Sequence, residues 1–139
     1  MTLYLDYNAS APIIRDVIDI MHKSIEIMGN PSSIHSSGRK ARKVVEDSRE
    51  LISETIDSNP KNIIFTSGAT EANTLALRCS HEMNTFISSI EHDSVLKQNI
   101  NANIIPVTSE GTVNLELLEK KLKKSFKKKI FVSIMAVNN

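Results

Sequence analysis

The stretch IIFTSGATE, which runs from Ile63 to Glu71, decides the fold of this chain. Its three apolar residues predict a short strand over 63–65, and the Thr-Ser-Gly turn that follows stops that strand. A helix is expected next, from Thr70 to Cys79, because hydroxyl residues and glycine are typical of helix starts. Strand, turn and helix in this order form the unit from which α/β proteins are built.

The same alternation of apolar runs and helices continues toward the C-terminus. Strands are expected at Phe86–Ile90, Ile104–Val107 and Ile130–Val137. Helices are expected at Asp93–Asn99 and Leu115–Lys124. Asn114 is expected to cap the second of these helices, and the last strand is apolar enough to be buried on both faces. Strands that alternate with helices predict a mostly parallel sheet.

Two longer helices are expected before the opening stretch, over residues 13–28 and 39–57. Pro12 suits a first helical turn, where a missing N–H costs nothing, and the residues from Gly29 to Pro31 are expected to end that helix. Residues 32–38 are interpreted as a loop. We therefore expect an N-terminal segment, residues 1–12, and one domain over residues 13–139 that includes both helices.

Composition limits the classes of function. The chain has 139 residues with 17 Lys plus Arg and 16 Asp plus Glu, and its net charge of +1 argues against a general nucleic-acid binder. A single cysteine excludes a disulfide framework and a cysteine-rich zinc module, so no metal site is expected. No apolar run is long enough to span a bilayer, and the first residues lack the pattern of an export signal. We therefore expect a cytoplasmic protein.

The turn in the opening stretch is a candidate phosphate site. A helix N-terminus offers N–H groups without partners and a partial positive charge. Gly68 allows the backbone to approach a ligand closely, and Ser67 and Thr70 add hydroxyl donors. Open α/β sheets bind ligands at the carboxyl ends of their strands, where this turn is expected to lie. The alternative is that the turn only caps its helix.

Other polar residues permit a functional and an ordinary explanation. His92 directly follows the strand expected at 86–90, where an imidazole can stack on a planar ligand or carry a proton; alternatively it is a surface histidine. Asn138 follows the last expected strand and can donate amide hydrogen bonds, or it is simply a polar residue near residue 139. Cys79 is interpreted as a small buried side chain. The basic run Lys120–Lys129 suits nucleic acid or anionic lipid, but a solvated helix end explains it more simply.

Taken together, these motifs resemble the N-terminal part of a cysteine desulfurase. The implied family is the NifS/IscS-like branch of the class-V aminotransferases, which are fold-type I pyridoxal-phosphate enzymes. The most specific match is FTSGATEAN, residues 65–73. The other matches are Tyr4–Ala9, Gly29–His35, Gly38–Arg39, Glu91–Leu96 and Met135–Asn139. All of them occur in the family's order, and Asn30-Pro31-Ser32-Ser33 before His35 points to this branch.

The resemblance implies a cofactor, a substrate and site residues. It implies that Ala69 and Thr70 hold the phosphate of pyridoxal 5′-phosphate. It also implies that His92 stacks on the pyridine ring and takes part in proton transfer, and that Asn138 contacts the cofactor and substrate region. L-cysteine is the implied substrate and iron–sulfur cluster biogenesis the implied role. Family members are homodimers, and the resemblance implies no nucleic-acid or membrane partner.

The resemblance reaches only about the first third of a family sequence. The family's Schiff-base lysine and catalytic cysteine belong to the part beyond residue 139, so covalent attachment of the cofactor is not expected here. The implied fold is α/β, an incomplete large domain of a fold-type I enzyme whose partial, mostly parallel sheet is flanked by helices. The strand at 86–90 then lies between the strands at 104–107 and 130–137. The strand at 63–65 lacks its neighbour.

Three functions follow from these observations. The leading interpretation is a truncated cysteine desulfurase-like protein that is inactive as an isolated chain. The alternative is a non-catalytic binding or regulatory module derived from a desulfurase. A basic nucleic-acid-binding protein is the third and rests only on the lysine run.

Overall fold

The computed structural model describes residues 3–7, 9–98, 101–125 and 129–137. The chain divides into two compact units, an N-terminal unit from Met1 to Phe65 and a C-terminal unit from Thr66 to Asn139. This boundary falls inside the stretch IIFTSGATE, directly before its turn. The expected separation of residues 1–12 from residues 13–139 stays a prediction.

The N-terminal unit is helical. It contains α1 (Arg15–Ile25), α2 (Ser36–Thr55) and the short 3₁₀ helix η1 (Pro60–Asn62). The expected helix over 13–28 is therefore shorter at both ends, and Pro12 lies before it rather than in its first turn. Its N-cap residue, Ile14, has no side-chain oxygen with which to cap the helix.

The second helix begins three residues earlier than expected, because a histidine caps it. His35 lies just before α2, and its Nδ1 accepts a hydrogen bond from the backbone N–H of Gly38 at 3.3 Å. Gly38 is buried, and a Cβ there would clash with the backbone carbonyl oxygens of Ser33 and Asn30. A Cβ at Gly29 would clash with the carbonyl of Ser37. Gly29 before this loop and Gly38 in the first turn of α2 are thus both required by close backbone packing.

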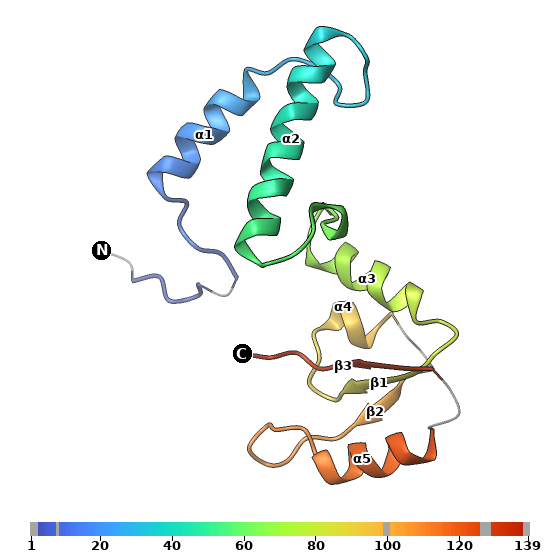
Figure 1. Ribbon diagram of the computed structural model, residues 1–139. Helices are drawn as coiled ribbons and strands as arrows, with labels where there is room; N and C mark the ends of the chain where they lie inside the picture. Colours follow the sequence, from blue (N-terminus) through green and yellow to red (C-terminus); the bar gives the residue numbers. More distant parts are fainter. Residues whose placement is uncertain (1–2, 8, 99–100, 126–128, 138–139) are drawn as a thin grey trace. The chain divides into compact units, whose positions relative to one another are not determined.

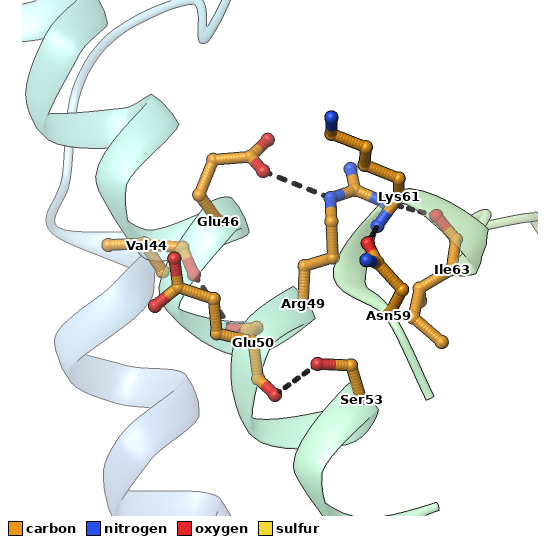
Figure 2. Close-up of polar contacts among 9 residues, drawn as sticks. Val44, Glu46, Arg49, Glu50, Ser53, Asn59, Lys61 and Ile63 are labelled. Atoms are coloured by element: carbon orange, nitrogen blue, oxygen red, sulfur yellow. Dashed lines mark hydrogen bonds and ion pairs between the residues drawn. The ribbon is translucent and has the colours of Figure 1, made fainter. Parts of the chain in front are cut away.

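The segment 63–65 does not form the expected strand. Arg49 of α2 instead contacts this segment, as Figure 2 shows: it donates to the backbone oxygen of Ile63 and to Glu46 at 3.0 Å. Its guanidinium also lies 4.9 Å from the centre of the Phe65 ring. A strand needs a hydrogen-bonded neighbour, and the family resemblance implied that this one lacks its own. Arg49 satisfies one carbonyl that such a neighbour would otherwise bind.

The C-terminal unit is an α/β layer structure. Its elements are α3 (Ala69–Cys79), β1 (Asn84–Ser88), α4 (Asp93–Leu96), β2 (Asn103–Ile105), α5 (Leu115–Lys124) and β3 (Ile130–Ser133). The strands form a parallel sheet in the order β2-β1-β3, with Phe86 opposite both Asn103 and Val132. Figure 1 shows α4 and α5 on opposite sides of this sheet. The expected partial parallel sheet, with the strand near residues 86–90 in its centre, is confirmed.

The core lies on the two faces of β1. Adjacent residues of a strand point to opposite faces, and Phe86 and Ile87 are both fully buried. Ile87 packs with Leu77 of α3 and Val95 of α4. Phe86 packs with Ile105 of β2 and Leu118 of α5. The central strand is therefore the element around which this unit is built.

Several expected boundaries in this unit change. The strand expected at 130–137 ends at Ser133, and Ile130 and Val132 are 36% and 41% exposed because β3 is an edge strand. It is therefore not buried on both faces. The strand expected at Ile104–Val107 ends at Ile105. Val107 pairs instead with Val113 in an isolated antiparallel bridge. The expected helix Leu115–Lys124 and its Asn114 cap are confirmed, with Asn114 Oδ1 accepting from the Leu117 N–H at 2.9 Å.

Candidate functional site

The N-terminus of α3 is open to a ligand. Gly68 is the N-cap residue, its backbone is extended, and no side chain caps the helix there. The first intrahelical bond runs from the Ala72 N–H to the Gly68 oxygen, so the N–H groups of Ala69 and Thr70 precede the helical ladder. Both residues are exposed, and a Cβ at Gly68 would meet nothing within 4 Å. The sequence-predicted residues Ala69 and Thr70 thus lie where an anion could reach them.

Glu71 folds back onto the turn before the helix. Its Oε2 accepts a hydrogen bond from the Ser67 N–H at 2.6 Å. This hydrogen bond lowers the pKa of the Glu71 carboxyl below its usual range. The Thr66 hydroxyl also donates to the Gly68 oxygen at 3.1 Å. Side-chain contacts therefore hold the turn in shape while the helix N–H groups stay open.

His92 follows β1 and caps α4. Its Nδ1 accepts the Ser94 N–H at 3.1 Å and lies 2.9 Å from the Ser94 hydroxyl oxygen. The His92 ring is exposed, whereas Ser94 is buried. The contacts described for this ring all use Nδ1, so Nε2 is the nitrogen that remains for a ligand.

Asn73 connects the two helix starts. It lies on α3, and its Nδ2 donates to the Ser94 oxygen at 2.8 Å. The order Asn73, Ser94, His92 is therefore a chain of hydrogen bonds from the phosphate-site helix to the candidate ring-binding residue. Asn73 and Ser94 are absent from the sequence-predicted site. A polar residue one turn into α3 and a serine two residues after His92 were the available signals.

Glu91 is a third residue that the sequence alone did not indicate. Its side chain is buried, and its Oε1 accepts from the Ser88 hydroxyl at 2.6 Å and from the Met135 N–H at 2.7 Å. These bonds attach the end of β1 to the segment that follows β3. Asn138, the fourth sequence-predicted site residue, lies three residues beyond Met135 and outside the described residues.

The remaining candidates lie elsewhere. Cys79, expected to be buried, is exposed at the end of α3. A pocket of the same unit, lined by residues that include Thr74, Arg78 and His81, contains none of Ala69, Thr70 or His92. Within the described ranges, no group of His, Cys, Asp or Glu could hold a metal ion, and no helix is long and apolar enough to cross a membrane.

The lysine run is partly engaged in local contacts. Lys123 pairs with Glu119 at 2.6 Å, and Lys121 donates to the Ile104 oxygen at 3.1 Å. The first contact lies along the surface of α5, and the second joins α5 to β2. Lys127 and Lys128 lie outside the described residues.

Comparison with known proteins gives the site its context. The family model for class-V aminotransferases matches residues 3–139. A cysteine desulfurase of Archaeoglobus fulgidus, IscS 1, is 41% identical over 98% of this chain and 38% of its own length. The cysteine desulfurase IscS of Dictyoglomus turgidum is 36% identical over 99% of this chain and 38% of its own length.

A solved structure agrees with these matches. The NifS-like protein of Rickettsia africae is 35% identical and superimposes with a TM-score of 0.90, covering 99% of this chain and 40% of that protein. The chain thus spans about two fifths of the length of the relatives it matches, slightly more than the third expected. The match over residues 3–139 shows that this chain belongs to the class-V aminotransferase family, where IscS and NifS-like cysteine desulfurases are among its relatives.

Proposed function

We propose that this chain is the part of a pyridoxal-phosphate-dependent cysteine desulfurase that holds the cofactor's phosphate and ring. Ala69 and Thr70 bind the phosphate, His92 lies against the pyridine ring, and Asn138 contacts the cofactor and substrate region. The observation that carries this proposal is the hydrogen-bonded chain from α3 through Asn73 and Ser94 to His92. This chain of hydrogen bonds connects α3, whose N-terminus suits an anion, with the exposed imidazole of His92.

The residues present fit such a cofactor. The N-terminus of α3 lacks a side-chain cap, and space around Gly68 is open. The Glu71 carboxylate binds the Ser67 N–H instead of the N–H groups of Ala69 and Thr70. A phosphate could therefore accept from those two N–H groups and from the Thr70 hydroxyl, an arrangement typical of helix N-termini.

The cofactor, when bound, supplies an electron sink for chemistry at the amino-acid substrate. The residues of this chain bind its phosphate, orient its ring and contribute a histidine beside it. The 139 residues contain no lysine in the family's Schiff-base context, and Cys79 does not match the family's nucleophile. We therefore propose that the chain alone does not turn over L-cysteine.

Other properties of the whole enzyme are extended to this chain by similarity. We propose L-cysteine as the substrate because the relatives are named cysteine desulfurases. The homodimer and the role in iron–sulfur cluster biogenesis are proposed from the family, and the cytoplasmic location is proposed from sequence composition alone.

The test is a cofactor titration followed by absorbance, beside an assay of alanine release from L-cysteine. Each is run on the chain alone and on the chain mixed with a polypeptide that carries the remaining part of a family sequence. We expect no alanine from the chain alone, above a control with free cofactor. In the mixture, Thr70→Val should weaken cofactor binding, because a hydrogen bond to a charged group contributes ~1.5–3 kcal/mol, or roughly ten- to a hundred-fold in affinity.

His92→Ala should reduce alanine release in the mixture more than it reduces cofactor binding, because the histidine contacts the ring rather than the phosphate. Alanine release by the chain alone that persists in Cys79→Ala would contradict the proposal that this chain alone does not turn over L-cysteine. Equal cofactor affinity for Thr70→Val and the parent would show that the turn before α3 is only a helix cap. Cofactor binding by the mixture without any alanine release would favour a non-catalytic binding module.

A further inference from the structure

We propose that Ser94 and Asn73 are positioning residues that hold the neutral imidazole of His92 in the form with its hydrogen on Nε2. The importance of this form for catalysis rests on the proposed function, but the form itself is a property of the chain. Three contacts within the C-terminal unit carry the inference.

The first contact is the cap of α4. The Ser94 N–H donates to His92 Nδ1 at 3.1 Å. A backbone N–H can only donate, so Nδ1 must offer its lone pair. A neutral imidazole that accepts at Nδ1 carries its hydrogen on Nε2.

The second contact is between side chains. The Ser94 hydroxyl oxygen lies 2.9 Å from the same Nδ1, and either group could donate if the pair were isolated. The Ser94 N–H decides the direction, because a Nδ1 that accepts from it carries no hydrogen of its own to donate. The Ser94 hydroxyl is therefore the donor to Nδ1, and its oxygen accepts from the Asn73 Nδ2 at 2.8 Å. Backbone and side chain of Ser94 therefore both direct hydrogens at one ring nitrogen.

Burial makes this arrangement persistent. Ser94 is 6% exposed, so little water competes for its hydroxyl. Rotating the hydroxyl away from Nδ1 would leave a buried donor without its partner, which is unfavourable. Asn73 is half-buried and comes from a different helix, so α3 and α4 must both hold their positions for the set to form.

This arrangement determines what the exposed nitrogen of His92 can do. In the neutral ring, Nε2 bears a hydrogen and is a donor. A base at Nε2 would need the opposite form, in which Nδ1 carries the hydrogen and loses the Ser94 N–H bond. In the proposed desulfurase, the neutral His92 therefore offers a hydrogen-bond donor at Nε2.

The chain contains two histidines that serve as internal comparisons. His35 caps α2 in the same way, with Nδ1 accepting the Gly38 N–H at 3.3 Å. His81 is the opposite case, because its Nδ1 lies 3.1 Å from the Arg78 backbone oxygen. A carbonyl oxygen only accepts, so this contact places a hydrogen on Nδ1 of His81. Its Nε2 lies 3.6 Å from Glu82 Oε1, which is longer than a hydrogen bond. The structure thus assigns opposite forms to His81 and to the two capping histidines.

The test is a long-range ¹⁵N–¹H correlation spectrum of the complete 139-residue chain, without cofactor, at about pH 8, well above the ordinary histidine pKa of ~6.5. His92→Ala identifies the His92 signals. We expect a pyridine-like shift for His92 Nδ1 and a pyrrole-like shift for Nε2, with the order reversed in His81. A pyrrole-like Nδ1 in His92 would overturn the assignment.

Two variants test the positioning roles. Asn73→Asp replaces the donor by an acceptor of the same shape, which should turn the Ser94 hydroxyl away from Nδ1 and bring the two His92 nitrogen shifts closer together. Ser94→Ala removes the hydroxyl but keeps the backbone N–H, and should bring the two nitrogen shifts closer together. Ser80→Ala, which also removes a buried serine hydroxyl but one bonded to the Leu77 oxygen, should leave the His92 shifts unchanged.

Unchanged His92 shifts in both Asn73→Asp and Ser94→Ala would overturn the roles of Asn73 and Ser94. Because the spectra contain no cofactor, this failure is distinct from failure of the proposed function. A chain that shows the expected shifts but binds no pyridoxal phosphate would keep the inference and contradict the proposed function.

Discussion

Glu71 places a negative charge beside the turn that is proposed to bind a phosphate. Its carboxylate is fully exposed in the turn region, yet the hydrogen bond from the Ser67 N–H holds its pKa below the usual range. The contact serves the conformation of the turn, because it satisfies an N–H that precedes the helix. The same charge opposes an anion bound nearby.

We predict that this contact is lost in acid. The folded-state pKa of Glu71 is lower than its unfolded value of about 4.5, so the contact contributes stability above that pH and loses it as the pH falls through the folded pKa. The measurement is the amide proton shift of Ser67 against pH. It should titrate with a midpoint below 4.5, and the titration should vanish in Glu71→Gln. A midpoint at or above 4.5 would contradict the contact.

The sequence revealed those site residues that lie in short motifs, and it did not reveal residues whose contacts join distant parts of the chain. Thr70 and His92 occur in short motifs directly after apolar runs, so the sequence alone placed them at helix starts. The positioning residues act over longer distances along the chain: Asn73 and Ser94 are 21 residues apart, and Glu91 and Met135 are 44 apart. No spacing rule connects such pairs, because the fold alone brings them together.

Elements were predictable where their ends carry ordinary signals. The helix Leu115–Lys124 was expected within its observed bounds, since Asn114 is a standard cap. The start of α2 was misplaced because a histidine rather than a serine or aspartate caps it. The strand expected at 63–65 failed for a different reason: apolar composition indicates a buried strand, but a strand forms only beside a partner.

The edge strand β3 is the element most prone to unwanted pairing. Among the described strands it lies at an edge of the sheet, and Val132 is 41% exposed. An edge strand presents backbone groups that can pair with another chain. We predict that the chain associates with itself as its concentration rises, and that Val132→Lys reduces this association because a charge on an edge strand opposes pairing. Sedimentation velocity over a range of concentrations measures the effect.

Leu115→Lys is the matched control, since Leu115 is also exposed but lies on α5. It should associate as the parent does. If Leu115→Lys reduces association as much as Val132→Lys, general surface hydrophobicity rather than the edge of β3 is responsible.

At the scale of the whole molecule, the two units differ in how much core each contains. The C-terminal unit buries apolar side chains on both faces of β1. Among the described residues of the N-terminal unit, Ala41 is the only buried hydrophobic side chain, and α1 has no buried residue. Burial of apolar surface is the main favourable term in folding, so the two units should differ in local stability.

We predict that amide hydrogen exchange separates them. The amides of Phe86 and Ile87 in the central strand should exchange slowest, and those in the middle of α1 should exchange at least about tenfold faster, which corresponds to ~1.4 kcal/mol in the free energy of opening. Exchange followed by NMR or mass spectrometry on the complete chain measures this difference. Helices in water without tertiary packing are marginal at the eleven-residue length of α1. Protection of α1 equal to that of β1 would show that the apolar face of α1 is covered in solution, for example by a second copy of the chain. The difference in buried core between the two units would then not describe the protein in solution.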